Sequence, residues 1–234
     1  MAIYSSPYAA RAANAGGGGG GATWILPTLS TFSELSGASY DHAGSSYSAN
    51  GGTAKTTETH GEPDAGLDAG GIVSPDLSLT LSEYSALVAE FDVDDIPAAG
   101  SGTKSLYFAL LNTNSLESGK GVYAGVERLA GGAYRLVAGV VGSNSSTSGQ
   151  FNAVFGRVRV TVTFTDTGIP GGISIAGVQA GRAAEYTAST GVEPIAFNTG
   201  VRVAILVGVE SNHALNDVEI DFSDLAYQFI LKPA

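Results

Sequence analysis

Carboxylates are the main groups in this chain that could do chemistry. Acidic residues gather at 62–68 and at 92–95, and Ca²⁺ takes oxygen ligands of this kind in sets of about six to eight. Neither group has the spacing of a calcium-binding loop, so solvated acids in turns are the favoured interpretation. We therefore predict no metal site and no cofactor.

Histidine, cysteine and serine offer no clearer site. His42, His60 and His213 lie far apart in the sequence, without the close spacing of zinc ligands. There is no cysteine, which excludes disulfides, thiolate metal sites and a cysteine nucleophile. Serines are so numerous that no Ser-His-Asp arrangement can be singled out. The sequence thus predicts no catalytic residue.

Residues 219–224 hold the sharpest acidic motif, Glu-Ile-Asp-Phe-Ser-Asp. In a regular strand Glu219 and Asp221 face one side, and Asp224 faces the other unless a bulge intervenes. The apolar residues between the acids alternate with them, which favours an outward polar row on a half-buried strand.

Arg157 and Arg159 share one face of a predicted strand, roughly 7 Å apart by strand rise. Together with Arg135 and Arg202 they could form cross-strand ion pairs with the acidic row at 219–221. Such a face would also suit a sugar platform, although ion pairing and solvation are the favoured interpretation. The candidate glycan-facing residues are Arg157, Arg159, Arg202, Glu219 and Asp221.

The elements that would position these residues are strands. Valine or phenylalanine alternates with arginine or threonine over 157–165, which predicts a strand with one face in the core. Residues 201–209 carry apolar or small residues on both faces, which indicates a central strand covered on both sides. Segments 121–129 and 133–142 flank Gly131-Gly132 and predict a hairpin. A second glycine pair, Gly171-Gly172, is predicted to link the strand at 157–165 to a strand at 173–178.

Helix signals are weak. Apolar residues between Leu81 and Phe91 have helical spacing, but residues 86–93 also alternate as a strand, and we favour the strand. Residues 33–71 are rich in small and polar residues and predict long loops with short edge strands.

Composition narrows the function classes. Hydrophobic residues make up 44% of the 234 residues and charged residues only 14%, and Lys plus Arg number 11 against 22 Asp plus Glu. The formal net charge of −11 argues against nucleic-acid binding, which needs clustered basic residues. The most apolar stretch, 201–209, is far shorter than the roughly 20 residues of a membrane span. We expect neither nucleic acid nor membrane as a partner.

A run of six glycines, Gly16–Gly21, separates an N-terminal arm from the rest of the chain. Polyglycine loses the most backbone entropy on ordering, so it acts as a flexible tether. The arm has no acidic residue, and its aromatic and apolar side chains suit an interface. The predicted anchor residues are Ile3, Tyr4, Pro7, Tyr8 and Arg11. We predict two parts, an anchoring arm at 1–22 and a β-sandwich domain at 23–234.

The order of the predicted strands resembles the concanavalin A-like lectin and glucanase sandwich, which includes laminin-G-like domains. The resemblance covers roughly residues 24–231, and the pair 201–207 and 218–222 is its most family-like part. It implies an all-β fold with two antiparallel sheets in a jelly roll, often with a carbohydrate-facing concave surface. It also implies a closing strand that lies beside the opening one.

Residues 219–224 also resemble the E-x-D-x-x-E signature of laminarinase-type glycoside hydrolases, with Asp224 replacing the second glutamate. This resemblance implies Glu219 as nucleophile, Asp221 as the residue that tunes it, and position 224 as acid/base. A retaining mechanism needs two carboxyls about 5 to 5.5 Å apart. However, the motif lies in the last strand rather than mid-chain, and Trp24 is the only tryptophan available to line a glucan cleft. The non-enzymatic interpretation is therefore favoured.

We expect a structural or accessory protein on the exterior of a bacteriophage or phage-like particle. Residues 1–15 lack an apolar signal region, so we expect synthesis in the host cytoplasm without a signal peptide and a final location on the virion surface. The expected partners are capsid, spike or tail subunits, further copies of this chain, and host surface polysaccharide. The alternatives are a free carbohydrate-binding module and a laminarinase-like hydrolase.

Overall fold

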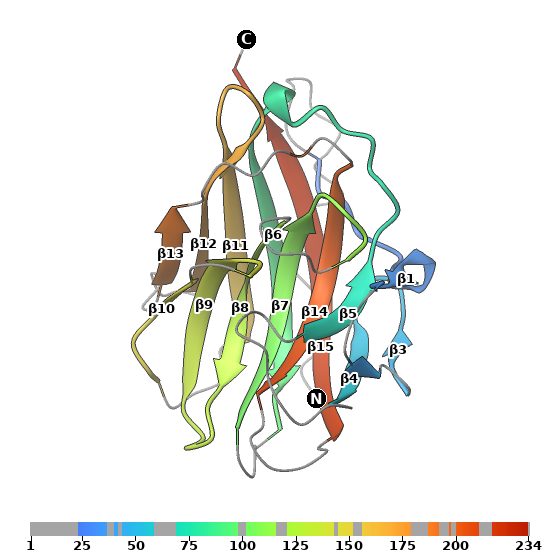
Figure 1. Ribbon diagram of the computed structural model, residues 1–234, viewed down its shortest axis with the longest axis vertical. Helices are drawn as coiled ribbons and strands as arrows, with labels where there is room; N and C mark the ends of the chain where they lie inside the picture. Colours follow the sequence, from blue (N-terminus) through green and yellow to red (C-terminus); the bar gives the residue numbers. More distant parts are fainter. Residues whose placement is uncertain are drawn as a thin grey trace, which may run out of the picture.

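Two antiparallel β-sheets face each other in a jelly-roll sandwich, as predicted (Figure 1). The computed structural model describes residues 23–36, 40–41, 44–58, 69–97, 102–115, 121–142, 145–151, 156–178, 187–191, 197, 200–210 and 217–233. Within these ranges the helical elements are two single 3₁₀ turns, η1 (Leu29–Thr31) and η2 (Leu81–Glu83). No helix in this part of the chain has the length and apolarity to cross a membrane.

Among the described residues, sheet A has eight strands and contains the long closing strand of the chain. In spatial order its strands are β13 (Thr187–Gly191), β12 (Pro170–Val178), β11 (Arg157–Phe164), β6 (Tyr84–Asp95), β15 (Asp217–Leu231), β4 (Gly52–Glu58) and β2 (Tyr40–Asp41), with β3 (Ser46–Tyr47) beside β4.

Sheet B, with seven strands in the part of the chain that the structure describes, faces the viewer in Figure 1. In spatial order its strands are β1 (Ser33–Glu34), β5 (Ala69–Val73), β14 (Arg202–Glu210), β7 (Thr103–Leu111), β8 (Gly121–Arg128), β9 (Tyr134–Val140) and β10 (Ser145–Thr147).

The core lies between the sheets and follows from the alternation of the strands. On β11, Val158, Val160 and Val162 are buried, whereas Arg159 and Thr163 are exposed. The same period of two on β6 buries Leu87, Ala89, Phe91 and Val93, because successive strand residues point to opposite faces. The strand interpretation of residues 86–93 is confirmed, and the helical spacing from Leu81 yields only the single turn η2.

The central strands of sheet B are buried on both faces, unlike β11 of sheet A. On β14, Val203, Ile205 and Val207 join the core between the sheets, while Ala204 and Leu206 are 1% and 0% exposed on the opposite face. This confirms the prediction of a central strand covered on both sides.

Turns largely follow the glycine pattern. Strands β8 and β9 form the predicted hairpin, and Gly132 has the positive φ of 85° that its tight turn needs. The turn predicted at Gly171-Gly172 was wrong, because both residues lie inside β12. The chain reverses instead just before β12, where Gly168 has φ 79°.

The chain's opening segment lies beside its closing strand, as the resemblance implied. Ile25 donates its backbone N–H to the carbonyl of Tyr227 in β15 at 2.7 Å and accepts the N–H of Tyr227 at 3.0 Å. The proposed arm, residues 1–22, lies outside the described residues.

Candidate functional site

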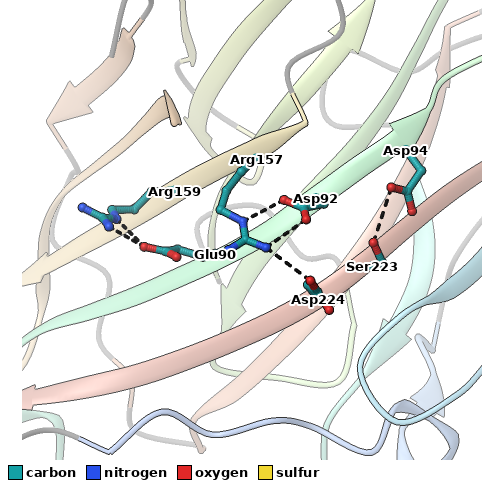
Figure 2. Close-up of polar contacts among 7 residues, drawn as sticks. All are labelled: Glu90, Asp92, Asp94, Arg157, Arg159, Ser223 and Asp224. Carbon is teal, nitrogen blue, oxygen red and sulfur yellow. Dashed lines mark hydrogen bonds and ion pairs between the residues drawn. The ribbon is translucent and has the colours of Figure 1, made fainter. Parts of the chain in front are cut away.

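The outer face of sheet A gathers charged side chains from three neighbouring strands (Figure 2). Register aligns Arg157 with Asp92 and Arg159 with Glu90, so each arginine on β11 faces an acid on β6. The Arg157 guanidinium donates from Nε to Asp92 Oδ1 at 2.7 Å and from Nη2 to Oδ2 at 2.8 Å. Arg159 donates from Nε to Glu90 Oε1 at 2.7 Å. The Arg157–Asp92 pair is bidentate and fixes both side chains, because the planar guanidinium fork matches the two oxygens of a carboxylate.

These ion pairs involve Arg157 and Arg159, two of the three arginines that were predicted to face a glycan. The Glu90 side chain is 2% exposed and the Arg159 side chain 45%, so the pair runs from the sheet surface toward solvent. The predicted partners in the acidic row at 219–221 are not the ones used. Glu219 Oε1 lies 3.5 Å from Lys55 Nζ, and Asp221 Oδ1 accepts a 2.6 Å hydrogen bond from the Thr53 hydroxyl. The favoured interpretation of cross-strand ion pairing is therefore correct for the arginines of β11, with different acids.

A β-bulge in β15 brings Asp224 to the same face. The register shifts between Ser223 and Ala226, and Asp224 has φ 53°, a left-handed conformation that Asp tolerates better than most residues. Its Oδ2 lies 3.4 Å from Arg157 Nη2. In a regular strand Asp224 would face away from Glu219, as predicted. The bulge interrupts the alternation, so Asp224 lies on the same face as Glu219.

The bulge does not create a retaining hydrolase pair from these residues. Strand rise separates Glu219 from Asp224 by about 13 to 17 Å, against the roughly 5 to 5.5 Å that a retaining mechanism needs and the roughly 6.5 to 9.5 Å of an inverting one. Glu219 is also well exposed, with 60% of its side chain in solvent. The geometry gives these two carboxylates no shared reacting centre.

Asp94 lies at the edge of this charged face. Its carboxylate accepts a 3.4 Å hydrogen bond from the Ser223 hydroxyl (Figure 2). Partial burial raises the pKa of Asp94 above its usual value, and the like charges of Asp92, Asp221 and Asp224 raise it further, against a lowering by the Ser223 hydroxyl. Within the described part of the chain, no three acidic or histidine side chains are placed to hold a metal ion.

A second polar cluster lies on the outer face of sheet B, and among its residues only Arg135 was a predicted ion-pairing residue. The Tyr107 hydroxyl donates to Glu127 Oε1 at 2.6 Å, and Arg135 Nε donates to Glu127 Oε2 at 2.5 Å. Tyr107 is 4% exposed and Glu127 is 7% exposed. Burial and the neighbouring Glu127 charge raise the pKa of Tyr107 well above its usual value. Both oxygens of a buried carboxylate thus have a donor.

Aromatic and small residues surround this cluster. Tyr123 packs edge-on against Tyr107 with ring centroids 5.1 Å apart. A Cβ on Gly139 would lie 2.8 Å from the Tyr123 ring, so the glycine leaves the space that the ring occupies. The hairpin already contained the signal for the ion pair, because pairing about Gly131 puts Glu127 directly opposite Arg135.

The remaining predicted site residues are dispersed or lie outside the described residues. Arg202 is in β14 of sheet B, where its Nη1 donates to the Asn112 carbonyl at 3.3 Å, and Arg135 is in β9 of the same sheet. The prediction that Arg135 and Arg202 share one face with the arginines of β11 is therefore wrong, since they belong to the other sheet. The anchor residues Ile3, Tyr4, Pro7, Tyr8 and Arg11, the acids at 62–68, and all three histidines lie outside the described residues.

Comparisons with known proteins give distant likenesses of fold alone. No protein-family model matches the chain, and no curated protein matches it. Among solved structures, lectin II from Ulex europaeus is 11% identical, with 91% of this chain and 99% of that chain covered and a TM-score of 0.48. The alginate lyase vAL-1 from Chlorella virus is 9% identical (86% and 93% covered, TM-score 0.40), and scytalido-glutamic peptidase is 12% identical (71% and 75%, TM-score 0.38).

Proposed function

We propose that this protein is a non-enzymatic structural or accessory protein on the exterior of a phage or phage-like particle. It serves as a decoration, spike, fibre-base or tail accessory subunit, held by residues 1–22 to a capsid, spike or tail subunit or to a sister copy. The single observation that carries the proposal is the hexaglycine run placed directly before a firmly attached chain segment.

That attachment is the antiparallel bridge between Ile25 and Tyr227. Its two backbone hydrogen bonds connect the chain to β15 a few residues after the last glycine. Strand β15 is itself paired with β6 and β4. In this proposal a pull on the arm would pass into an interior strand of sheet A, and the polyglycine run would serve as the tether. Fifteen extended residues span about 50 Å, enough to cross to a neighbouring subunit.

The charges of the body support a displayed module rather than a nucleic-acid binder. The arginines of β11 are neutralised by Asp92 and Glu90, and the acidic excess of the chain disfavours contact with phosphates. Binding of host surface polysaccharide is a second role that the sandwich could add on the same particle.

Co-sedimentation tests the proposal. Particles purified from cells that produce the protein are mixed with the full-length chain or with a version that starts at Ala22. The proposal predicts that the full-length chain sediments with particles and that the truncated chain stays in the supernatant. If neither form sediments with particles but both bind envelope polysaccharide, the protein is a free carbohydrate-binding module. Sugar release that Glu219→Gln abolishes would instead establish the hydrolase.

A further inference from the structure

The turn between β3 and β4 carries the one Asn-Gly pair of the sequence, Asn50-Gly51. The Ser48 N–H and the Ser48 hydroxyl both donate to the Gly51 carbonyl, at 2.9 and 3.1 Å, and close the turn. Ser48 and Ala49 are exposed, and Asn50 is half-buried. The Asn50 side chain therefore lies in an ordered turn that water can reach.

This turn packs against the bulge of β15 that carries Asp224. The Leu225 N–H donates to the Asn50 carbonyl at 2.8 Å. A Cβ on Gly51 would lie 2.7 Å from the Phe222 carbonyl oxygen, so the close approach of the two segments requires glycine at this position. The turn and the bulge thus hold each other in place through backbone contacts.

An asparagine followed by glycine can react with its own backbone. The Gly51 nitrogen loses its proton and bonds to Asn50 Cγ, the Cγ–Nδ2 bond breaks, and the side-chain nitrogen takes up a proton and leaves as ammonia. Glycine favours this attack because it has no Cβ to crowd the nitrogen. Water then opens the resulting succinimide at either carbonyl, which leaves aspartate or isoaspartate. The net reaction consumes water and releases ammonia, and it needs no other reactant.

We propose that Asn50 is a site of spontaneous deamidation and that isoaspartate at this position loosens the bulge of β15. Isoaspartate makes the main chain longer by a methylene group between Asn50 and Gly51. The two residues are fixed on either side of that bond, by Leu225 and by Ser48, so the longer chain cannot keep both sets of contacts. Deamidation also adds a negative charge beside the bulge that carries Asp224. The proposal goes beyond the tethered role and depends on neither the arm nor the particle.

Peptide mapping of the aged full-length chain tests the proposal, since chromatography with mass spectrometry separates the asparagine, aspartate and isoaspartate peptides. Asn114, an exposed asparagine followed by serine, is the internal comparison. We expect Asn50 to convert about tenfold faster than Asn114, which is a modest difference in activation free energy. Conversion should be faster at pH 9 than at pH 6, because the attacking nitrogen must lose its proton. The converted chain should unfold about 4 to 8 °C below the fresh chain, because backbone contacts of the turn are lost.

Asn50→Gln is the matched control, because glutamine keeps the amide while its longer side chain closes the corresponding imide ring much more slowly. The variant should keep residue 50 unmodified and its Tm unchanged through the same incubation. The proposal is overturned if Asn50 stays intact in the folded chain while it converts in urea, if conversion leaves Tm unchanged, or if aged Asn50→Gln loses as much Tm as the aged wild type. None of these outcomes bears on particle attachment, so this proposal and the tethered role fail separately.

Discussion

The buried Glu127 on the outer face of sheet B should stabilise the fold through its charge, and Glu127→Gln tests this. Glutamine keeps the size of the side chain but has one acceptor oxygen in place of two. Tyr107 and Arg135 both donate to Glu127, to different oxygens. One of the two donors must therefore lose its acceptor in the variant.

The magnitude follows from which donor can reach water. The Arg135 side chain is 32% exposed and can turn toward solvent, whereas Tyr107 is 4% exposed and cannot. A buried donor without an acceptor costs about 1–3 kcal/mol, and a hydrogen bond to a charged group contributes about 1.5–3 kcal/mol. We expect a loss of about 2 kcal/mol in the free energy of unfolding, which lowers Tm by about 4 to 8 °C in a domain of this size.

Calorimetry and urea unfolding at pH 7 measure this loss, with Glu219→Gln as the matched control. Glu219 is an exposed glutamate, also in an antiparallel strand and also near a basic side chain, and its replacement should change the free energy by less than about 0.5 kcal/mol. Tyr107→Phe in combination with Glu127→Gln should cost clearly less than the sum of the single changes, because both remove the same hydrogen bond. If Glu127→Gln is no more destabilising than Glu219→Gln, the buried network does not stabilise the fold and the reasoning is refuted.

Three further predictions concern backbone packing and pH. Gly125→Ala should destabilise the fold by more than about 2 kcal/mol, because its Cβ would fall on the Leu106 carbonyl, whereas Gly131→Ala has open space and should be neutral in urea unfolding. The raised pKa of Asp94 means that its charged carboxylate is disfavoured in the folded state. Asp94→Asn should therefore raise Tm by about 1 to 2 °C at pH 7, and this gain should vanish below about pH 3.5. Equal Tm values for the variant and the wild type at pH 7 would contradict this prediction. Burial raises the pKa of Tyr107, so its contribution to stability is complete below about pH 10 and is lost as the pH rises further. Unfolding followed by tyrosinate absorbance should show this loss of stability. Tyr107→Phe should make stability fall less steeply as the pH rises above about 10.

Sequence patterns were sufficient for the sandwich because a period of two on a half-buried strand leaves few alternatives. The valine rows of β11 and β14 and the glycine pair at 131–132 led directly to strands and a hairpin. The strand at 86–93 competed with a helix and was resolved correctly by its continued alternation.

Side-chain partners were harder to predict, because they depend on which strands are neighbours. Arg157 could be placed on an outward face, but its pairing with Asp92 required β11 to lie beside β6, which no local pattern reveals. Asp224 reached that face through a bulge, and a one-residue insertion in a ladder leaves little trace in the sequence. The Glu127 pair was the exception, since the hairpin register alone would have placed it opposite Arg135.

The most direct test of the proposed function transfers the arm to another protein. Residues 1–22 are fused to a monomeric fluorescent protein, and the fusion is mixed with purified particles beside a version in which Tyr4 and Tyr8 are alanine. The proposed anchoring predicts that the native arm alone brings fluorescence into the particle pellet and that the double alanine version binds at least tenfold more weakly. Fluorescence that stays in the supernatant with both arms, while the full-length chain still sediments, would contradict anchoring by the arm and assign attachment to the sandwich.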